Sequence, residues 1–143
     1  MNTTTSTLKT ATANKSNFNS KVRIVLFWIA TGIVGLETAV GSYWDIAQIE
    51  FVLTVMKQLG YPAYFLTIMG IWKALGVVAL LSPRLPLLKE WIYAGLVFVY
   101  TGAAASHLAV GEIPQAVGPL IFTGLTFASW ALRPASRKFQ AAK

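Results

Sequence analysis

The chain has 143 residues, no cysteine and a formal net charge of +7, and 55% of its residues are hydrophobic while 12% are charged. A soluble domain carries about 25% charged residues, so this composition favours a membrane protein. The length leaves room for a single domain. The absence of cysteine excludes disulfides, thiolate metal sites, iron–sulfur clusters and thiol catalysis.

Four stretches of the chain are apolar on all sides and about as long as a membrane-crossing helix: Val22–Trp44, Tyr61–Leu81, Trp91–Val110 and Ile113–Leu132. A hydrocarbon core of ~30 Å needs ~20 helical residues, and little of the chain lies outside these stretches. The connections between the later spans are short, and short connections make consecutive helices antiparallel neighbours. The sequence therefore predicts an all-α integral membrane protein, built as a four-transmembrane-helix antiparallel bundle.

Polar segments flank this membrane domain, which we expect over residues 21–133. Residues 1–20 are rich in Thr, Ser, Asn and Lys and have too little apolar material to fold alone, so they predict a disordered cytoplasmic arm. The apolar stretch that follows is too long for a signal peptide and is expected to stay as the first span. Residues 134–143 form a basic cytoplasmic tail.

Lysine and arginine lie almost entirely on one side of the predicted spans. They occur before the first span, between the second and third, and after the fourth, at Lys9, Lys15, Lys21, Arg23, Arg84, Lys89, Arg133, Arg137, Lys138 and Lys143, while Lys57 lies on the other side. Because such residues accumulate on the cytoplasmic side of short loops, we expect a multi-pass inner-membrane protein with both termini in the cytoplasm. No basic stripe interleaved with aromatic residues is present, so the expected partner is the lipid bilayer and not a nucleic acid.

The segment Asp45–Gly60, between the first two spans, is too polar to cross a membrane. Its apolar residues fall on one helical face, at Ile49, Val52, Leu53, Met56 and Leu59. This pattern predicts an extra amphipathic helix that lies on the outer membrane surface or folds over the mouth of the bundle. Gly60 suits the end of that helix, and Pro62 suits the first turn of the next one.

Ionisable residues inside the spans are costly, so each needs a partner or a function. A rise of 1.5 Å per residue places Glu37 and His107 at depths of about 22 and 24 Å from the inner surface, and Lys73 at about 18 Å from the outer surface. We expect the three to converge in the outer half of the bundle. Ser106 precedes His107 but points about 100° away from it.

Two interpretations of these residues stay open. In the first, Glu37 and Lys73 form a buried ion pair that fixes helix register, with His107 bound to a carbonyl group or facing the lipid headgroups. In the second, the same residues form a ligand or proton site. One histidine and one carboxylate are too few ligands for a metal site, and no hydrolase or nucleotide-binding motif is present.

Glu90 falls in the first turn of the predicted third span, next to Trp91. A carboxylate there interacts favourably with the helix dipole and can pair with Arg84 or Lys89 at the inner surface. We therefore expect Glu90 to stabilise the start of this helix.

Several motifs together resemble the DoxX-like family of small four-span bacterial membrane proteins: GYPAYF at Gly60–Phe65, GIWKALG at Gly70–Gly76, LLSPRLPLLKEW at Leu80–Trp91 and YTGAAASHLAVGE at Tyr100–Glu112. The resemblance covers roughly Val22 to Leu132 and implies the four-helix membrane fold. It transfers no catalytic set. The matching positions of interest are Lys73, Glu90, Trp91, Ser106 and His107. Members of the family have been tied to quinone-linked oxidation of sulfur compounds, to membrane redox complexes and to receptor assembly or cargo handling.

Two functions are consistent with the sequence, and the sequence does not decide whether the chain is an enzyme. In the first, it binds a small hydrophobic molecule, a quinone or a lipid, as part of a membrane redox system, in an outer-half polar pocket that includes Glu37, Lys73, Tyr100, Ser106 and His107. In the second, it is a non-enzymatic assembly or scaffolding subunit. Glu37 and Lys73 then form a structural ion pair. Its partner is then another membrane protein or a second copy of the chain.

The predicted topology can be tested with single cysteines at Ser6, Gln48 and Ala142, because the natural chain has none. In intact cells an impermeant thiol reagent should label the Gln48 site and neither terminal site, which become reactive after the cells are lysed. Labelling of the termini in intact cells without labelling at Gln48 would reverse the orientation.

Overall fold

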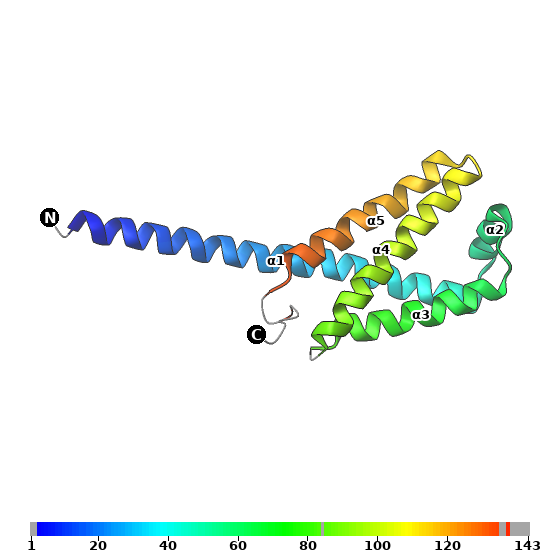
Figure 1. Cartoon of the computed structure of the whole chain (residues 1–143), viewed down its shortest axis with the longest axis horizontal. Helices are drawn as coiled ribbons and strands as arrows, with labels where there is room; N and C mark the ends of the chain where they lie inside the picture. Colours follow the sequence, from blue (N-terminus) through cyan, green and yellow to red (C-terminus); the bar gives the residue numbers. More distant parts are fainter. Residues whose placement is uncertain (1–2, 84, 135–136, 138–143) are drawn as a thin grey trace.

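The computed structural model describes residues 3–83, 85–134 and 137, with side chains from Ser20 onward. Its helices are α1 (Thr3–Ala47), α2 (Glu50–Leu59), α3 (Tyr64–Leu81), α4 (Pro86–Ala109) and α5 (Ile113–Leu132), as Figure 1 shows. Four segments are long and apolar enough to cross a membrane, namely Ser20–Ala47 of α1 and the whole of α3, α4 and α5. The prediction of an all-helical protein with four spans is confirmed.

The helix boundaries differ from the predicted spans at positions where a glycine or proline ends or begins a helix. Helix α2 ends at Gly60, whose φ of 78° needs a residue that tolerates the left-handed region, and the Tyr61 backbone still binds Met56 O. Pro62 therefore lies just ahead of α3 and accepts a backbone hydrogen bond from Phe65. Helix α4 begins five residues earlier than predicted, at Pro86, because proline suits the first helical position.

Both ends of α1 lie outside the span predicted for it. The helix begins at Thr3, inside the segment expected to be a disordered arm, and no glycine or proline interrupts the chain before Gly32. Side chains before Ser20 lie outside the described residues, so the cytoplasmic location of the arm stays a prediction. At the other end α1 continues to Ala47, which moves Asp45 from the predicted surface segment into a spanning helix. The tail over 134–143 lies almost wholly outside the described residues.

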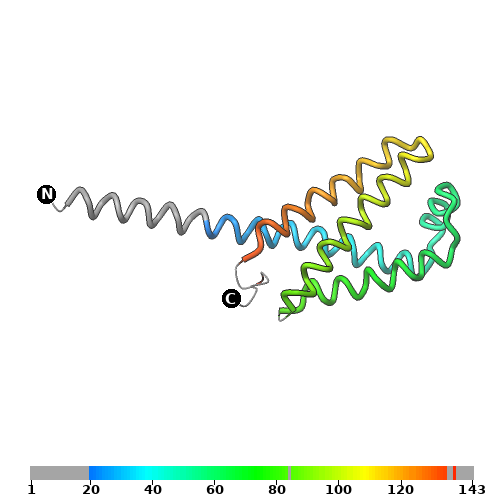
Figure 2. The backbone as a smooth tube through the Cα atoms, in the orientation of Figure 1, coloured from blue at the N-terminus to red at the C-terminus, as the bar shows by residue number. Residues whose placement is uncertain are grey.

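Helix α1 packs against both α3 and α5. Helix α3 lies along its C-terminal half, α5 crosses it nearer Ser20, and α4 packs mainly against α5 (Figures 1 and 2). Helices α3 and α4 make few contacts and diverge from their short connection, as the tube in Figure 2 shows. The core between α1, α4 and α5 is built from Val34, Leu96 and Tyr100, with Ile92, Phe122 and Leu125 packed against them.

Close approach of α1 and α3 depends on Gly70. A Cβ atom at this position would lie 2.6 Å from Cγ1 of Ile46 and 3.0 Å from the carbonyl oxygen of Ser42. The Ser42 hydroxyl donates a hydrogen bond of 2.7 Å to the Gly70 carbonyl. In lipid, helices associate through such close backbone contacts at small residues, so Gly70 fixes how α3 lies along α1.

Substituting Gly70 should therefore destabilise the fold. Gly70→Ala puts a methyl group against the α1 backbone, and we expect a loss of about 1–3 kcal/mol, as for other overpacked sites. The matched control is Gly76→Ala on the same helix, where a Cβ atom meets nothing within 4 Å. The melting temperature of Gly70→Ala in detergent should be clearly lower than those of the wild type and the control. Equal melting temperatures for the two variants would contradict the close contact.

Candidate functional site

One face of α1 carries polar side chains into the interior. Thr31, Thr38 and Asp45 are spaced by seven residues, and Ser42 lies one turn beyond Thr38. All four are buried, with exposed fractions between 2% and 6%. Seven residues make nearly two full turns, so the four side chains form a single stripe along the helix. We call these four residues the α1 polar stripe.

At one end of the stripe, Thr31 connects α1 to α4 and α5. Its hydroxyl donates to the Phe27 carbonyl at 2.7 Å, so it accepts from the Ser129 hydroxyl at the same distance. Ser129 in turn lies 2.8 Å from the Tyr93 hydroxyl, which donates to it. Each hydroxyl thus donates to the next, from Tyr93 to Ser129 to Thr31 and on to the Phe27 carbonyl. Every buried hydroxyl in this series has a hydrogen-bond partner.

In the middle of the stripe, Tyr100 of α4 joins two residues of α1. The phenol donates to the Glu37 carboxylate, and the Thr38 hydroxyl lies 3.0 Å from the same phenol oxygen. Tyr100 is buried and Glu37 is half-buried. The phenol therefore satisfies a carboxylate that would be costly to leave unpaired inside a membrane.

Lys73 of α3 makes its ion pair with Asp45 at 2.7 Å, which corrects the predicted direct pair with Glu37. Side chains on a helix tilt towards its N-terminus, so Lys73 leans along α3 towards the end of α1 that carries Asp45. Glu37 is still near. A Cβ atom at Gly41 would lie 3.5 Å from Lys73 Nζ and 3.7 Å from Glu37 Oε1, so both charged groups border the space above Gly41.

His107 and Ser106 lie at helix connections and do not join this cluster. His107 Nδ1 is 2.8 Å from Glu112 Oε2, and the Glu112 backbone N–H donates to the His107 carbonyl at 2.9 Å. Ser106 donates to the Gly102 carbonyl and accepts a hydrogen bond of 2.9 Å from the Tyr61 hydroxyl. The expected convergence of all three ionisable residues is therefore wrong: Glu37 and Lys73 come together, and His107 closes the α4–α5 turn.

Glu90 pairs with Arg133 at the end of α5, a partner that the sequence did not predict, while Arg84, one of its two expected partners, lies outside the described residues. Its two oxygens lie 2.8 and 3.0 Å from the Arg133 guanidinium nitrogens, and Trp130 Nε1 donates to one of them at 2.9 Å. Because α4 begins at Pro86, Glu90 is already past the first turn of the helix. A bidentate pair of this kind fixes geometry as well as charge, so it ties α5 to α4.

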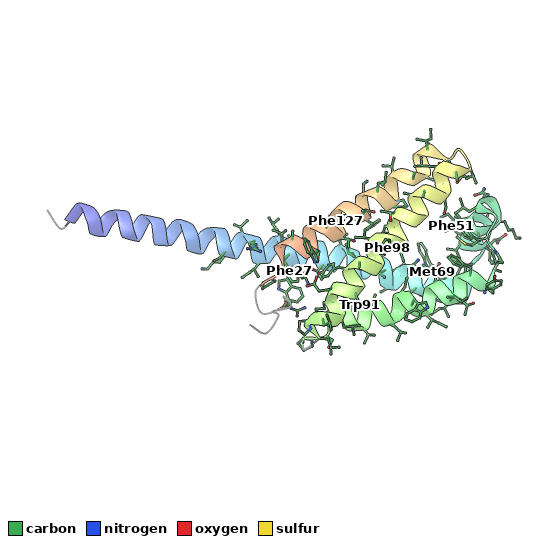
Figure 3. The ribbon with its side chains drawn as sticks, in the orientation of Figure 1. Phe27, Phe51, Met69, Trp91, Phe98 and Phe127 are labelled. Atoms are coloured by element: carbon green, nitrogen blue, oxygen red, sulfur yellow. The ribbon has the colours of Figure 1, made fainter. Side chains whose placement is uncertain are left out.

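A groove of about 760 Å³ opens where α3 and α4 diverge. Its lining is apolar apart from Ser82 and Lys73, and Lys73 is the one charged residue in it. Figure 3 labels Met69 on α3 and Trp91 on α4, which both line this groove. We call it the α3–α4 groove. It lies beside Lys73, so one ligand could contact both the apolar walls and the ammonium group.

Among the described residues, no three His, Asp or Glu side chains lie close enough together to hold a metal ion.

The α1 polar stripe was not predicted from the sequence. The seven-residue repeat of Thr31, Thr38 and Asp45 was a usable signal, because a single polar seam on an otherwise apolar helix indicates a face turned to other helices and not to lipid.

The Asp45–Lys73 pair can be tested by a double-mutant cycle. Lys73→Met or Asp45→Asn alone should lower stability by about 2–3 kcal/mol, because each leaves an unpaired charge inside the membrane domain. The double variant should recover much of that loss. The matched control is Lys73→Met with Glu37→Gln, for which we expect a smaller coupling. A larger coupling to Glu37 than to Asp45, measured by thermal unfolding in detergent, would refute the assignment.

Comparison with known protein families gives a match over residues 29–129, which is most of the chain, to the DoxX-like family. No curated protein and no solved structure matches it. The matched region contains the whole α1 polar stripe, the Asp45–Lys73 ion pair and the motifs at Lys73, Glu90 and His107. The chain belongs to the DoxX-like family.

Proposed function

We propose that the chain binds a hydrophobic molecule with a polar head, a quinone, in the α3–α4 groove. The observation that carries this proposal is the apolar groove with a single charged residue, Lys73, in its lining. Small-molecule sites commonly have volumes of ~300–1,000 Å³ and apolar walls with a few polar groups that fix orientation. A quinone has the matching parts, since its ring carries carbonyl acceptors and its tail is apolar.

Lys73 would hold the quinone head. An ammonium group has three N–H donors, and the bond to Asp45 Oδ2 uses one of them. A second N–H can donate to a quinone carbonyl while Asp45 keeps the lysine charged and in place. Glu37 also lies near the Lys73 ammonium group above Gly41 and is hydrogen-bonded to Tyr100, although neither residue lines the groove. In this proposal the two residues supply protons to the quinone head by way of Lys73 during its reduction, with electrons supplied by a partner in a membrane redox system.

We also propose that the four spans form an antiparallel bundle in the inner membrane with both termini cytoplasmic. The short connections between α3, α4 and α5 and the one-sided distribution of Lys and Arg support this arrangement. The finer placement of α2 is part of the same proposal. None of its residues is buried, and its apolar face would rest on the outer membrane surface. The Asp45–Lys73 pair then lies towards the outer side, and the groove runs from Lys73 towards the cytoplasmic connection between α3 and α4.

The groove can be filled to test ligand binding. Gly76→Leu places a side chain in the groove from a position where a Cβ atom meets nothing within 4 Å, so the fold should tolerate it. Gly124→Leu on α5 is the matched control, because it also meets nothing within 4 Å and lies outside the groove lining. We expect ~10-fold less co-purified quinone per protein in Gly76→Leu than in the wild type or the control, measured by mass spectrometry after mild detergent extraction.

A companion variant, Lys73→Met, should lose quinone as well, because it removes the donor for the head and leaves the apolar walls intact. Equal quinone content in wild type, Gly76→Leu and Lys73→Met would reject the proposal. If the wild type carries no quinone but a stoichiometric membrane protein that Gly76→Leu releases, the groove is an assembly surface and the chain is a scaffolding subunit.

A further inference from the structure

A buried lysine lies at the start of α4. Lys89 is 2% exposed, and its Nζ atom makes no hydrogen bond in the part of the chain that the structure describes. It lies on the inward face of α4, which also carries Tyr93, Leu96 and Tyr100. Burying an ammonium group without a counter-charge costs several kcal/mol. A bound anion beside Lys89 would offset this cost.

The surroundings of Lys89 are positively charged. The guanidinium groups of Arg133 and Arg137 lie close enough for their charges to act on the Lys89 ammonium. Arg133 is itself buried, with 3% exposed, and its charge is matched by Glu90. Arg137 lies with its guanidinium carbon 4.7 Å from the centre of the Trp28 ring. Of these three cations, Arg133 therefore has a carboxylate partner, and the described residues supply none for Lys89.

We propose that Lys89, Arg133 and Arg137 bind a phosphate-type anion at this end of the bundle, carried by an anionic phospholipid headgroup or present as free phosphate. Arginine guanidinium groups match phosphate oxygens in geometry, and lysine adds a compact positive charge. The N-terminus of α4, which starts three residues before Lys89, adds the positive end of its helix dipole. Lys89 also lies near the beginning of a span, at the depth where headgroup phosphates are found.

A second groove next to this cluster favours the phospholipid as the source of the phosphate. It measures about 320 Å³ and lies between α4 and α5, where Figure 3 labels Phe98 and Phe127 among its lining residues. Glu90, Tyr93 and Trp130 line the same groove, and all three contact Arg133. An acyl chain in this groove would therefore begin beside the arginine. The groove shares no lining residue with the α3–α4 groove, so this site is independent of the proposed quinone site.

The test compares the purified full-length wild type with Lys89→Met in lipid–detergent mixtures that contain phosphatidylglycerol or phosphatidylcholine. Phosphatidylglycerol should raise the melting temperature of the wild type above its value in phosphatidylcholine. It should not raise that of Lys89→Met, whose affinity for phosphatidylglycerol by native mass spectrometry should fall at least ~10-fold, as expected for a lost charge-assisted hydrogen bond. Without anionic lipid, Lys89→Met should be as stable as the wild type or more stable, because an unpaired buried charge has been removed.

The matched control is Lys57→Met, which removes the same charge from the exposed face of α2 and should behave as the wild type. Arg137→Gln is a second variant of the site for the case in which Lys89→Met does not fold, and it should also weaken phosphatidylglycerol binding. Inorganic phosphate separates the two sources: a shift that depends on Lys89 with phosphate alone assigns a free anion, and a shift with phosphatidylglycerol alone assigns the lipid headgroup. The proposal is overturned if phosphatidylglycerol or phosphate stabilises the site variants as much as the wild type, or if neither of them stabilises the wild type above its value in phosphatidylcholine.

Discussion

The need to satisfy polar groups inside a lipid-embedded bundle organises this structure, and the α1 polar stripe is where that need is met. Water is absent from the hydrocarbon core, so a buried hydroxyl or charge must find its partner within the protein. Thr31 finds Ser129 of α5, Thr38 finds Tyr100 of α4, and Ser42 and Asp45 find Gly70 and Lys73 of α3. Each contact sets the register of one helix against α1. The few direct contacts between α3 and α4 follow, because α3 packs against α1 whereas α4 packs mainly against α5.

This arrangement also explains why a charged groove is tolerable. Lys73 lines an apolar opening, yet it is neutralised from the α1 side by Asp45, and its side chain is 19% exposed. A ligand would therefore meet a positioned ammonium group whose charge is already compensated. The carboxylate of Glu37 is compensated separately, by the Tyr100 phenol. Lys73 and Glu37 thus lie near each other above Gly41, and each is paired with a different residue.

Much of the fold could be predicted from the sequence, because apolar length and Lys/Arg placement are local properties. The four spans, the short helix between the first two and its end at Gly60 all follow from such signals. The partners of the charged residues could not be predicted in the same way. Depth counting placed Glu37 in the outer half and Lys73 near the midplane within reach of it, but the close contact at Gly70 and the lean of the Lys73 side chain decide that Asp45 is the partner. Asp45 itself was assigned to the surface because the end of α1 was placed three residues too early.

The partner of Glu90 shows the same limit. The helix-dipole argument considered its sequence neighbours, whereas the structure brings Arg133 to it from 43 residues away. Contacts of this kind depend on how α4 and α5 lie side by side, which composition and spacing do not specify. Lys89 is the converse case: it was counted as one of the loop cations, and its burial without a partner became visible when α4 was seen to begin at Pro86.

The central claim is that the polar stripe of α1 faces the other helices, and disulfide cross-linking in native membranes tests it most directly because the natural chain contains no cysteine. The side chains of Thr31 and Ser129 meet at 2.7 Å, whereas Gly32, the next residue of α1, lies on the exposed face. We predict that the pair Thr31→Cys with Ser129→Cys forms a disulfide on mild oxidation and that Gly32→Cys with Ser129→Cys does not. Equal or preferential cross-linking of the Gly32 pair would show that this face of α1 is turned to lipid, in contradiction to the account.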